Sequence, residues 1–183
     1  MYIHGDLGFR PVEAGDLDAL KELHNEMSTL LQLGNVEMFS SEEQAQWWKS
    51  LAGSRTTRRF AIVELRENTV IGVIRVQNID ALNRNCEVGL DIVPTLRRRG
   101  YGRASYRMLL EYLFLHFNMH MVYLRVGEFN GQAKALYERL GFVEGGAFKE
   151  YLYRHGRYWD YILMCMTKEQ YLKAYEAHRG ARE

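Results

Sequence analysis

The chain has 183 residues, a formal net charge of +1 and 47% apolar residues. This length predicts a single domain over residues 1–183 with a frayed tail at 177–183, since domains run to roughly 100–200 residues. The near-neutral charge argues against nucleic acid or an anionic membrane as a partner, and no apolar run reaches the roughly 20 residues of a membrane-spanning helix. The N-terminus lacks the charged-then-apolar pattern of a secretory signal, and Cys86 and Cys165 lie in apolar runs that suit buried free thiols. We therefore expect a cytoplasmic protein.

The N-terminal part predicts a strand, two helices and a hairpin. A short strand is expected at residues 7–12, and Asp16 then precedes apolar positions with helical spacing as far as Leu31. Ser40 and Glu43 have the spacing of a capping box, which predicts the start of a second helix. Strand-like runs at residues 60–65 and 70–76 flank a polar turn, so we expect a hairpin there.

The C-terminal part adds a strand–loop–helix–strand unit. The strand at residues 86–93 stops at Pro94, and apolar residues with helical spacing then run from Tyr106 to Phe117. Further strands are expected at residues 121–126, 142–143, 150–153 and 158–166, with a short helix at 132–140. Because such a unit sits inside a sheet that is otherwise joined by hairpins, the sequence predicts a mixed α/β fold.

The loop that follows the strand at residues 86–93 has the composition of an anion site. Unpaired N–H groups at a helix N-terminus attract phosphate, and glycine lets the main chain come close to it. We therefore expect a pyrophosphate site, although a surface loop with solvated arginines has the same composition. No third glycine completes a dinucleotide fingerprint, and the P-loop pattern is absent. The loop residues are Arg97, Arg98, Arg99, Gly100, Tyr101, Gly102 and Arg103.

A second segment, from Asn130 to Phe142, reads N-x-x-A-x-x-x-Y-x-x-x-G-F. Together with R-x-x-G-x-G at residues 97–102, it resembles the GNAT superfamily of N-acetyltransferases, and the resemblance extends over residues 9–171. The sequence H-G-R-Y-x-D at residues 155–160 is similar to the subgroup of ribosomal-protein and spermidine acetyltransferases. The resemblance implies a mixed, mostly antiparallel central sheet flanked by helices, and acetyl-CoA as co-substrate without a metal.

In this family the acetyl group passes directly to an amine, which implies a role for several residues. Tyr137 matches the general acid that protonates the departing thiolate, although its spacing also suits a packed helix face. A backbone N–H within residues 90–92 would stabilise the oxyanion, and the same stretch would pair with the pantetheine arm. Glu87, on the same strand, is a candidate base, or equally a partner in a structural salt bridge. The resemblance assigns coenzyme binding to Leu90, Asp91, Ile92, the seven loop residues from Arg97 to Arg103, Asn130, Ala133 and Tyr137.

The acceptor amine is the least determined part of this interpretation. Residues 30–39, which should border it, contain a single acid, Glu37, whereas a polycation needs several. Arg75, together with Trp47 and Trp48, would suit an amine that carries phosphate or carboxylate, such as an amino-sugar nucleotide. Protein N-termini and polyamines remain alternatives, and so does a non-catalytic acyl-CoA-binding regulatory module.

Other chemistries have weaker support in the sequence. His116 and His120 are four residues apart, but two histidines alone do not form a metal site. Ser105 lacks the surrounding G-x-S-x-G pattern of a hydrolase nucleophile. The sequence therefore predicts an enzyme whose partner is a small-molecule amine, with neither nucleic acid nor membrane, and it leaves a homo-oligomer open.

Overall fold

The computed structural model describes residues 1–180, and an eight-stranded mixed sheet runs through them. The strand order is β1-β2-β3-β4-β5-β6-β8-β7. Neighbouring strands are antiparallel except for β5 and β6, which are parallel. This arrangement confirms the predicted mixed, mostly antiparallel sheet. The strands are β1 Tyr2–His4, β2 Leu7–Pro11, β3 Arg58–Glu64, β4 Thr69–Asp80, β5 Asn85–Ile92, β6 Met121–Gly127, β7 Val143–Arg154 and β8 Arg157–Thr167.

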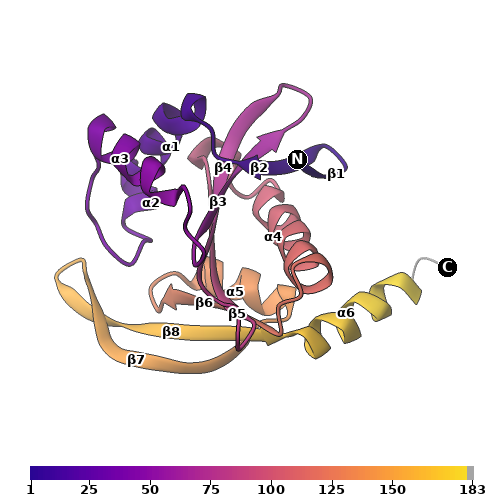
Figure 1. Cartoon of the computed structure of the whole chain (residues 1–183). Coiled ribbons are helices and arrows are strands. Elements are labelled where there is room, and N and C mark those ends of the chain that lie inside the picture. The colour runs from indigo at the N-terminus through magenta and orange to yellow at the C-terminus, as the bar shows by residue number, and fades with distance from the viewer. Residues whose placement is uncertain (181–183) are drawn as a thin grey trace.

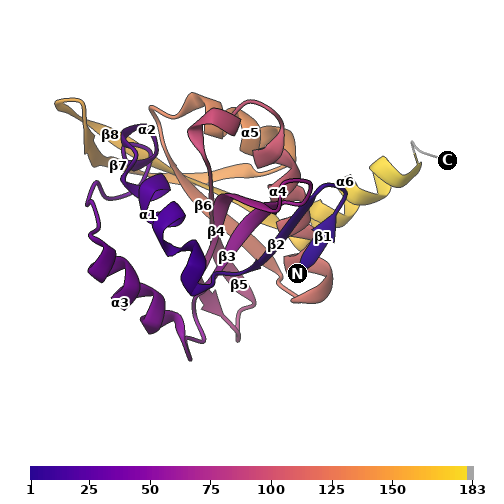
Figure 2. The same cartoon turned by 90° about the horizontal axis from the view of Figure 1, so that it is seen from above.

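Helices lie on both faces of the sheet. Figure 1 shows α1, α2 and α3 on one side of the central strands and α4 on the other, and the view from above in Figure 2 agrees. The chain then leaves β8 through α6, which extends away from the sheet at the C-terminal end. The helices are α1 Leu17–Asn25, α2 Met27–Leu30, α3 Ser41–Leu51, α4 Tyr101–Glu111, α5 Gly131–Leu140 and α6 Lys168–Gly180.

Alternation along the central strands divides their side chains between the two faces. On the α4 side, Phe60, Ile74 and Val88 belong to the main core with the buried residues of that helix. On the other side, Ala61 packs with Val12 and Leu20 in a smaller cluster beneath α1 and α3. Because successive residues of a strand point to opposite faces, the polar residues in register with Ala61 lie on the α1–α3 side. These are Arg59, Arg75, Gln77, Glu87, Gly89 and Asp91.

The predicted capping box is confirmed, but the first predicted helix is wrong in two respects. Ser40 Oγ accepts a hydrogen bond from the Glu43 N–H at 3.2 Å, and the Glu43 carboxylate accepts one from the Ser40 N–H at 2.8 Å. Asp16 precedes α1, but its carboxylate accepts hydrogen bonds from Arg10 and the Glu13 N–H instead of capping that helix. The helix also ends at Asn25, because Glu26 is extended and its carboxylate caps the separate helix α2.

Three further features differ from the sequence predictions. The helix expected to reach Phe117 changes to a π-turn over Tyr112–His116. The strands predicted at residues 142–143 and 150–153 are parts of one long strand, β7. Residues 177–180, predicted as part of a frayed tail, continue α6, while residues 181–183 lie outside the described part of the chain. The strand β1 and the helix α6 were both missed.

Neither cysteine forms a disulfide: Cys86 is buried and Cys165 is half-buried. Burial raises the pKa of the Cys86 thiol to about 12, so this thiol is protonated at neutral pH. Within residues 1–180, no helix combines the length and the apolar character that crossing a membrane requires.

Candidate active site

The parallel strands β5 and β6 pair over only three residues before they separate. Residues 85–87 of β5 face 121–123 of β6, whereas β5 continues to Ile92. The Val93 N–H donates to the Ile71 carbonyl at 2.9 Å, which sets the alternation of the β4–β5 ladder. By that alternation the main-chain groups of Asp91 turn toward β4, and those of Leu90 turn toward the side that β6 has left. Of the three residues predicted to supply the oxyanion donor, Asp91 is therefore excluded, and Leu90 and Ile92 remain.

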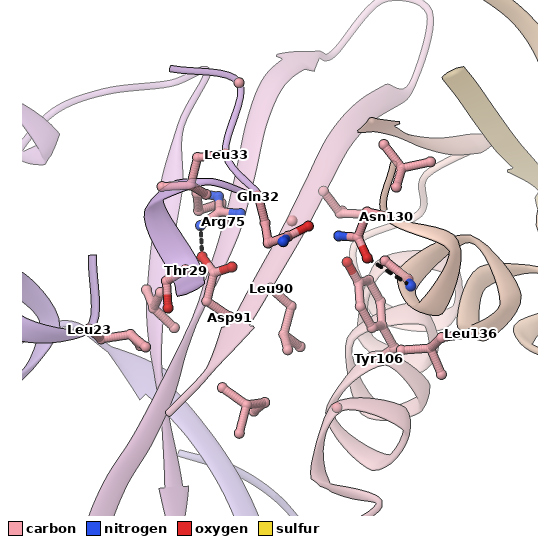
Figure 3. Close-up of a pocket in the computed structure, with 18 of the residues that line it drawn as sticks. Leu23, Thr29, Gln32, Leu33, Arg75, Leu90, Asp91, Tyr106, Asn130 and Leu136 are labelled. Carbon is pink, nitrogen blue, oxygen red and sulfur yellow. Dashed lines mark hydrogen bonds and ion pairs between the residues drawn. The ribbon is translucent and has the colours of Figure 1, made fainter. Parts of the chain in front are cut away.

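A cleft of about 1240 Å³ lies beside this separated part of β5. Figure 3 shows part of its lining: Leu23, Thr29, Gln32 and Leu33 come from the N-terminal helices and the segment after them, Asn130 is the N-cap residue of α5, and Leu136 lies within that helix. The cleft brings together most of the predicted site residues. Those that line it are Trp47, Arg75, Glu87, Leu90, Asp91, Ile92, Arg97, Arg98, Gly100, Gly102, Arg103, Asn130, Ala133 and Tyr137.

The loop before α4 has the backbone of an anion site. Gly100 is the N-cap residue with φ of +89°, a left-handed conformation that glycine adopts without strain. A Cβ atom built at Gly102 would lie 3.9 Å from Leu136 and 4.0 Å from Ile92, which are ordinary contacts. Packing within the protein therefore does not require glycine at 102. Its missing side chain leaves open space next to the first N–H groups of α4, where phosphate binds well.

Not every loop residue faces the cleft as predicted. Arg97 is held by the protein itself: Nε donates to the Ile92 carbonyl at 2.9 Å, and the other nitrogens donate to Ser28 Oγ at 2.7 Å and to Thr29 Oγ1. Arg97 thus ties α2 to the loop. Arg99 and Tyr101 are not among the lining residues: Arg99 is exposed, and Tyr101 packs against the core.

Tyr137 projects from α5 into the cleft beside a second tyrosine. Its ring meets that of Tyr106 edge-on, with centroids 5.4 Å apart, and Tyr106 Oη donates to Tyr137 Oη at 3.3 Å. Burial raises the pKa of Tyr137, so the phenol is protonated at neutral pH. Asn130 caps the same helix, since its Oδ1 accepts from the Ala133 N–H at 3.1 Å (Figure 3).

Both carboxylates of the cleft are already engaged. Glu87 accepts from Arg125 Nε at 2.8 Å, from Arg125 Nη2 at 2.9 Å and from Asn78 Nδ2 at 2.8 Å. Only 7% of its side chain is exposed, and these three hydrogen bonds occupy three of the roughly four lone-pair positions of the carboxylate. These contacts match the structural salt bridge, which the sequence left open as the alternative to a catalytic base.

Arg75, which was expected to bind an anionic group of the acceptor, lines the cleft but is paired within the protein. Arg75 is paired with Gly89 in the β4–β5 ladder, and its guanidinium forms an ion pair with Asp91, two residues after Gly89 on β5 (Figure 3). The side chain crosses over Gly89, where a Cβ atom would lie only 2.7 Å from Arg75 Nη2. The missing side chain at Gly89 therefore makes the ion pair sterically accessible.

The two tryptophans of α3 have different environments. Trp48 donates its indole N–H to the Val12 carbonyl at 3.1 Å and packs against the cluster beneath α1, so its prediction as a cleft residue is wrong. Trp47 lines the cleft, with the Arg59 guanidinium 6.0 Å from its ring centroid. Sequence reasoning missed Arg59 and Arg125 as site residues. Strand alternation could have identified Arg59, because it places Arg59 and Ala61 on one face of the sheet and Phe60 on the other.

Within residues 1–180, no group of three or more histidine, cysteine, aspartate or glutamate side chains could hold a metal ion. The cleft instead offers main-chain donors, glycines and arginines at one end and paired charges with aromatic rings at the other. Such a site can hold an anionic coenzyme against β5 while a second molecule approaches from the α1–α3 side.

Comparisons with known proteins agree with this geometry. The family model described as an acetyltransferase (GNAT) domain matches residues 6–143. Spermidine N(1)-acetyltransferase of Vibrio cholerae is 29% identical over 174 residues, covering 95% of this chain and all of that protein. A putative ribosomal N-acetyltransferase of Bacillus subtilis is 28% identical over 107 residues, which are 58% of each chain.

Solved structures of N-acetyltransferases also resemble this chain. The crystal structure of spermidine N-acetyltransferase from Vibrio cholerae in complex with CoA and spermine superimposes with a TM-score of 0.86 at 29% identity, covering 91% of this chain and 98% of that chain. A dodecameric structure of the Vibrio cholerae enzyme superimposes with a TM-score of 0.80 at 30% identity, covering 91% and 96%. The sheet that opens at β5, the glycine loop before α4 and these similarities together identify the chain as a member of the GNAT family and an N-acetyltransferase.

Proposed function

We propose that the chain transfers the acetyl group of acetyl-CoA directly to a primary amine of a small molecule. The observation that carries this proposal is the unpaired stretch of β5 at Leu90, which faces the cleft that also holds Tyr137 and the glycine loop. The pantetheine arm would pair with this stretch as an added strand. The pyrophosphate would lie at Gly100 and Gly102, against the N-terminus of α4.

The reaction needs an oxyanion donor and a proton for the leaving group. As the neutral amine attacks the thioester carbonyl, the Leu90 N–H would donate to the oxyanion that forms. When the carbon–sulfur bond breaks, the Tyr137 phenol would protonate the thiolate, and its raised pKa keeps the phenol in the acid form. The nitrogen carries an extra proton after the attack and would release it to solvent in the cleft, from which Tyr137 would regain a proton. The amine arrives as an ammonium of pKa about 10.4 and must lose a proton first. Because Glu87 accepts three hydrogen bonds, we assign this step to solvent in the cleft and give Glu87 a structural role.

Two classes of acceptor are supported by different observations. The relatives named spermidine acetyltransferases, among them those of Vibrio cholerae and Escherichia coli, support a polyamine. An amino-sugar nucleotide has no support among the relatives. An amine that carries a separate anionic group is favoured by the charges of the cleft, where both carboxylates are already paired with arginines.

Release of the CoA thiol from acetyl-CoA, measured against a panel of amines, tests this proposal. We expect thiol release that depends on a primary amine, with acetylated amine formed in equal amount. The matched control is the Tyr137→Phe variant, which should bind acetyl-CoA but release thiol slowly. If acetyl-CoA binds and no amine in a broad panel is acetylated, the chain is a non-catalytic acyl-CoA-binding module instead.

We also propose that the protein acts as a homo-oligomer in a reducing compartment, the cytoplasm. The dodecameric structure of the Vibrio cholerae relative supports self-association. The two free thiols, one of them buried, support the compartment.

A further inference from the structure

The acceptor end of the cleft contains one arginine more than it has carboxylates. Arg125 is paired with Glu87, and Arg75 is paired with Asp91. Arg59 forms no ion pair with any residue in the described part of the chain. Its guanidinium donates to the Arg58 carbonyl at 3.2 Å and to Gln77 Oε1 at 3.0 Å, which are both neutral acceptors.

Arg59 lies at the same level of the sheet as the site of transfer. The ladder pairs Arg59 with Arg75, and Arg75 with Gly89, the residue before Leu90. Two inter-strand steps separate Arg59 from Gly89, which places their Cα atoms about 10 Å apart. A small acceptor whose amine lies near Leu90 can therefore reach the Arg59 guanidinium with its other end.

The charge and the free N–H groups of Arg59 favour the binding of an anion. Burial, with the nearby charge of Arg75, lowers the pKa of Arg59 to about 10, so the guanidinium is still charged at neutral pH. Arg59 is half-buried at the wall of the cleft, and the one carboxylate that acts on it, Glu87, is already paired with Arg125, so an anion from a bound molecule would supply the counter-charge that Arg59 lacks. Gln77 and the Arg58 carbonyl each accept one N–H of the guanidinium, and the Trp47 ring centroid lies 6.0 Å from it. Three of the five guanidinium N–H groups are left to donate to a carboxylate or phosphate.

We propose that Arg59, held by Gln77 and Trp47, is an anion subsite that recognises a carboxylate or phosphate on the acceptor amine. This inference rests on the proposed acetyl transfer and names the substrate class for it. A polyamine would bring a second ammonium group against Arg59 with no unpaired carboxylate nearby. The relatives' polyamine acceptors are therefore expected to be poor substrates of this chain.

Amines of equal length with different ends test the subsite. Acetyl transfer would be measured for δ-aminovalerate, pentylamine and cadaverine, whose far ends are anionic, neutral and cationic. A second pair, aminopentyl phosphate and aminopentanol, distinguishes phosphate from carboxylate. We expect kcat/KM for at least one anionic member to exceed that of its neutral partner by about 10–100-fold, and cadaverine to be the weakest.

Arg59→Met should abolish this preference, measured as the ratio of kcat/KM for an anionic amine to that for its neutral partner in the same variant, and Arg59→Lys should retain part of it. Arg58→Met is the matched control, because Arg58 is exposed on the same strand and donates to the carbonyls of Ser54 and Thr57. Its preference should equal that of the wild type. Equal rates for anionic and neutral partners, a preference for cadaverine, or an unchanged preference in Arg59→Met would overturn the proposal.

Binding separates a failure of this inference from a failure of the proposed function. Calorimetry would measure δ-aminovalerate and aminopentyl phosphate binding to the CoA-saturated protein. If no amine is acetylated but one of these compounds binds to the wild type and not to Arg59→Met, the subsite stands and the acetyl transfer fails. If amines are acetylated while neither compound binds through Arg59, the subsite is refuted and the acetyl transfer stands.

Discussion

Replacing Glu87 by glutamine should destabilise the protein while leaving its chemistry largely intact. The substitution keeps the shape of the side chain but removes its charge and turns one acceptor oxygen into an N–H donor. Arg125 Nε can still find an acceptor, whereas Arg125 Nη2, now 2.9 Å from a carboxylate oxygen, loses one. Asn78 can rotate its amide to fit either partner.

The expected loss of stability follows from the number and burial of these contacts. An unsatisfied buried donor costs about 1–3 kcal/mol, and breaking a buried ion pair costs about 3–5 kcal/mol. Because 29% of the Arg125 side chain is exposed, water recovers part of this cost, and we expect a loss of about 2–4 kcal/mol. For a chain of this size, that corresponds to a decrease in Tm of roughly 4–16 °C.

Thermal unfolding followed by circular dichroism would measure the change, together with kcat for the best amine. Arg125→Met and the double variant complete the cycle. If the pair is structural, the double variant should be more stable than the sum of the single losses predicts. A Glu87→Gln variant with wild-type Tm and a kcat reduced more than about 100-fold would refute the reasoning and restore Glu87 as the catalytic base.

Four further outcomes are expected. Tyr137→Phe should lower kcat about 10²–10⁴-fold with unchanged acetyl-CoA affinity by calorimetry, and a wild-type kcat would mean that the residue only packs. Since burial raises the pKa of Tyr137 above 10.0 and the acid form is lost only as pH rises through that value, the pH profile of kcat should show no decline from this phenol below about pH 10. Tyr106→Phe should lower kcat less, and this loss should vanish in the Tyr137→Phe background, while additive losses would contradict the contact between the two phenols. Gly102→Val should weaken acetyl-CoA binding at least about 10-fold, because its side chain would fill the space beside the first N–H groups of α4; unchanged affinity in the folded variant would contradict the loop assignment.

The coenzyme end of the site could be predicted because its signals are local. The strand, the glycine turn and the start of α4 follow one another within a few residues, and the spacing from Asn130 to Tyr137 is set by one helix. Periodicity and turn chemistry act over such distances. The elements of the fold were predictable for the same reason, since hairpins and amphipathic helices carry their patterns in short windows.

The acceptor end could not be predicted because its charges are balanced across the sheet. Glu87 and its partner Arg125 are 38 residues apart, and Arg97 and Thr29 are 68 residues apart. Only the order and register of the strands determine which arginine meets which carboxylate. For this reason the ion pair between Arg75 and Asp91 was not foreseen, and Arg59, which forms no ion pair among the described residues, was overlooked as a site residue.

The short junction between β5 and β6 has a consequence for how the protein holds together. Three residue pairs join the strands β1–β5 to the strands β6–β8, so in the absence of coenzyme the amides of residues 88–92 that face the gap should exchange rapidly with deuterated water. A bound coenzyme that pairs with β5 would slow this exchange and link the two halves. At a concentration 100 times its Kd, it would add about 2.7 kcal/mol to the free energy of unfolding. Acetyl-CoA would then be a structural member of the sheet as well as a reactant, and its depletion would expose the chain to local opening at this junction.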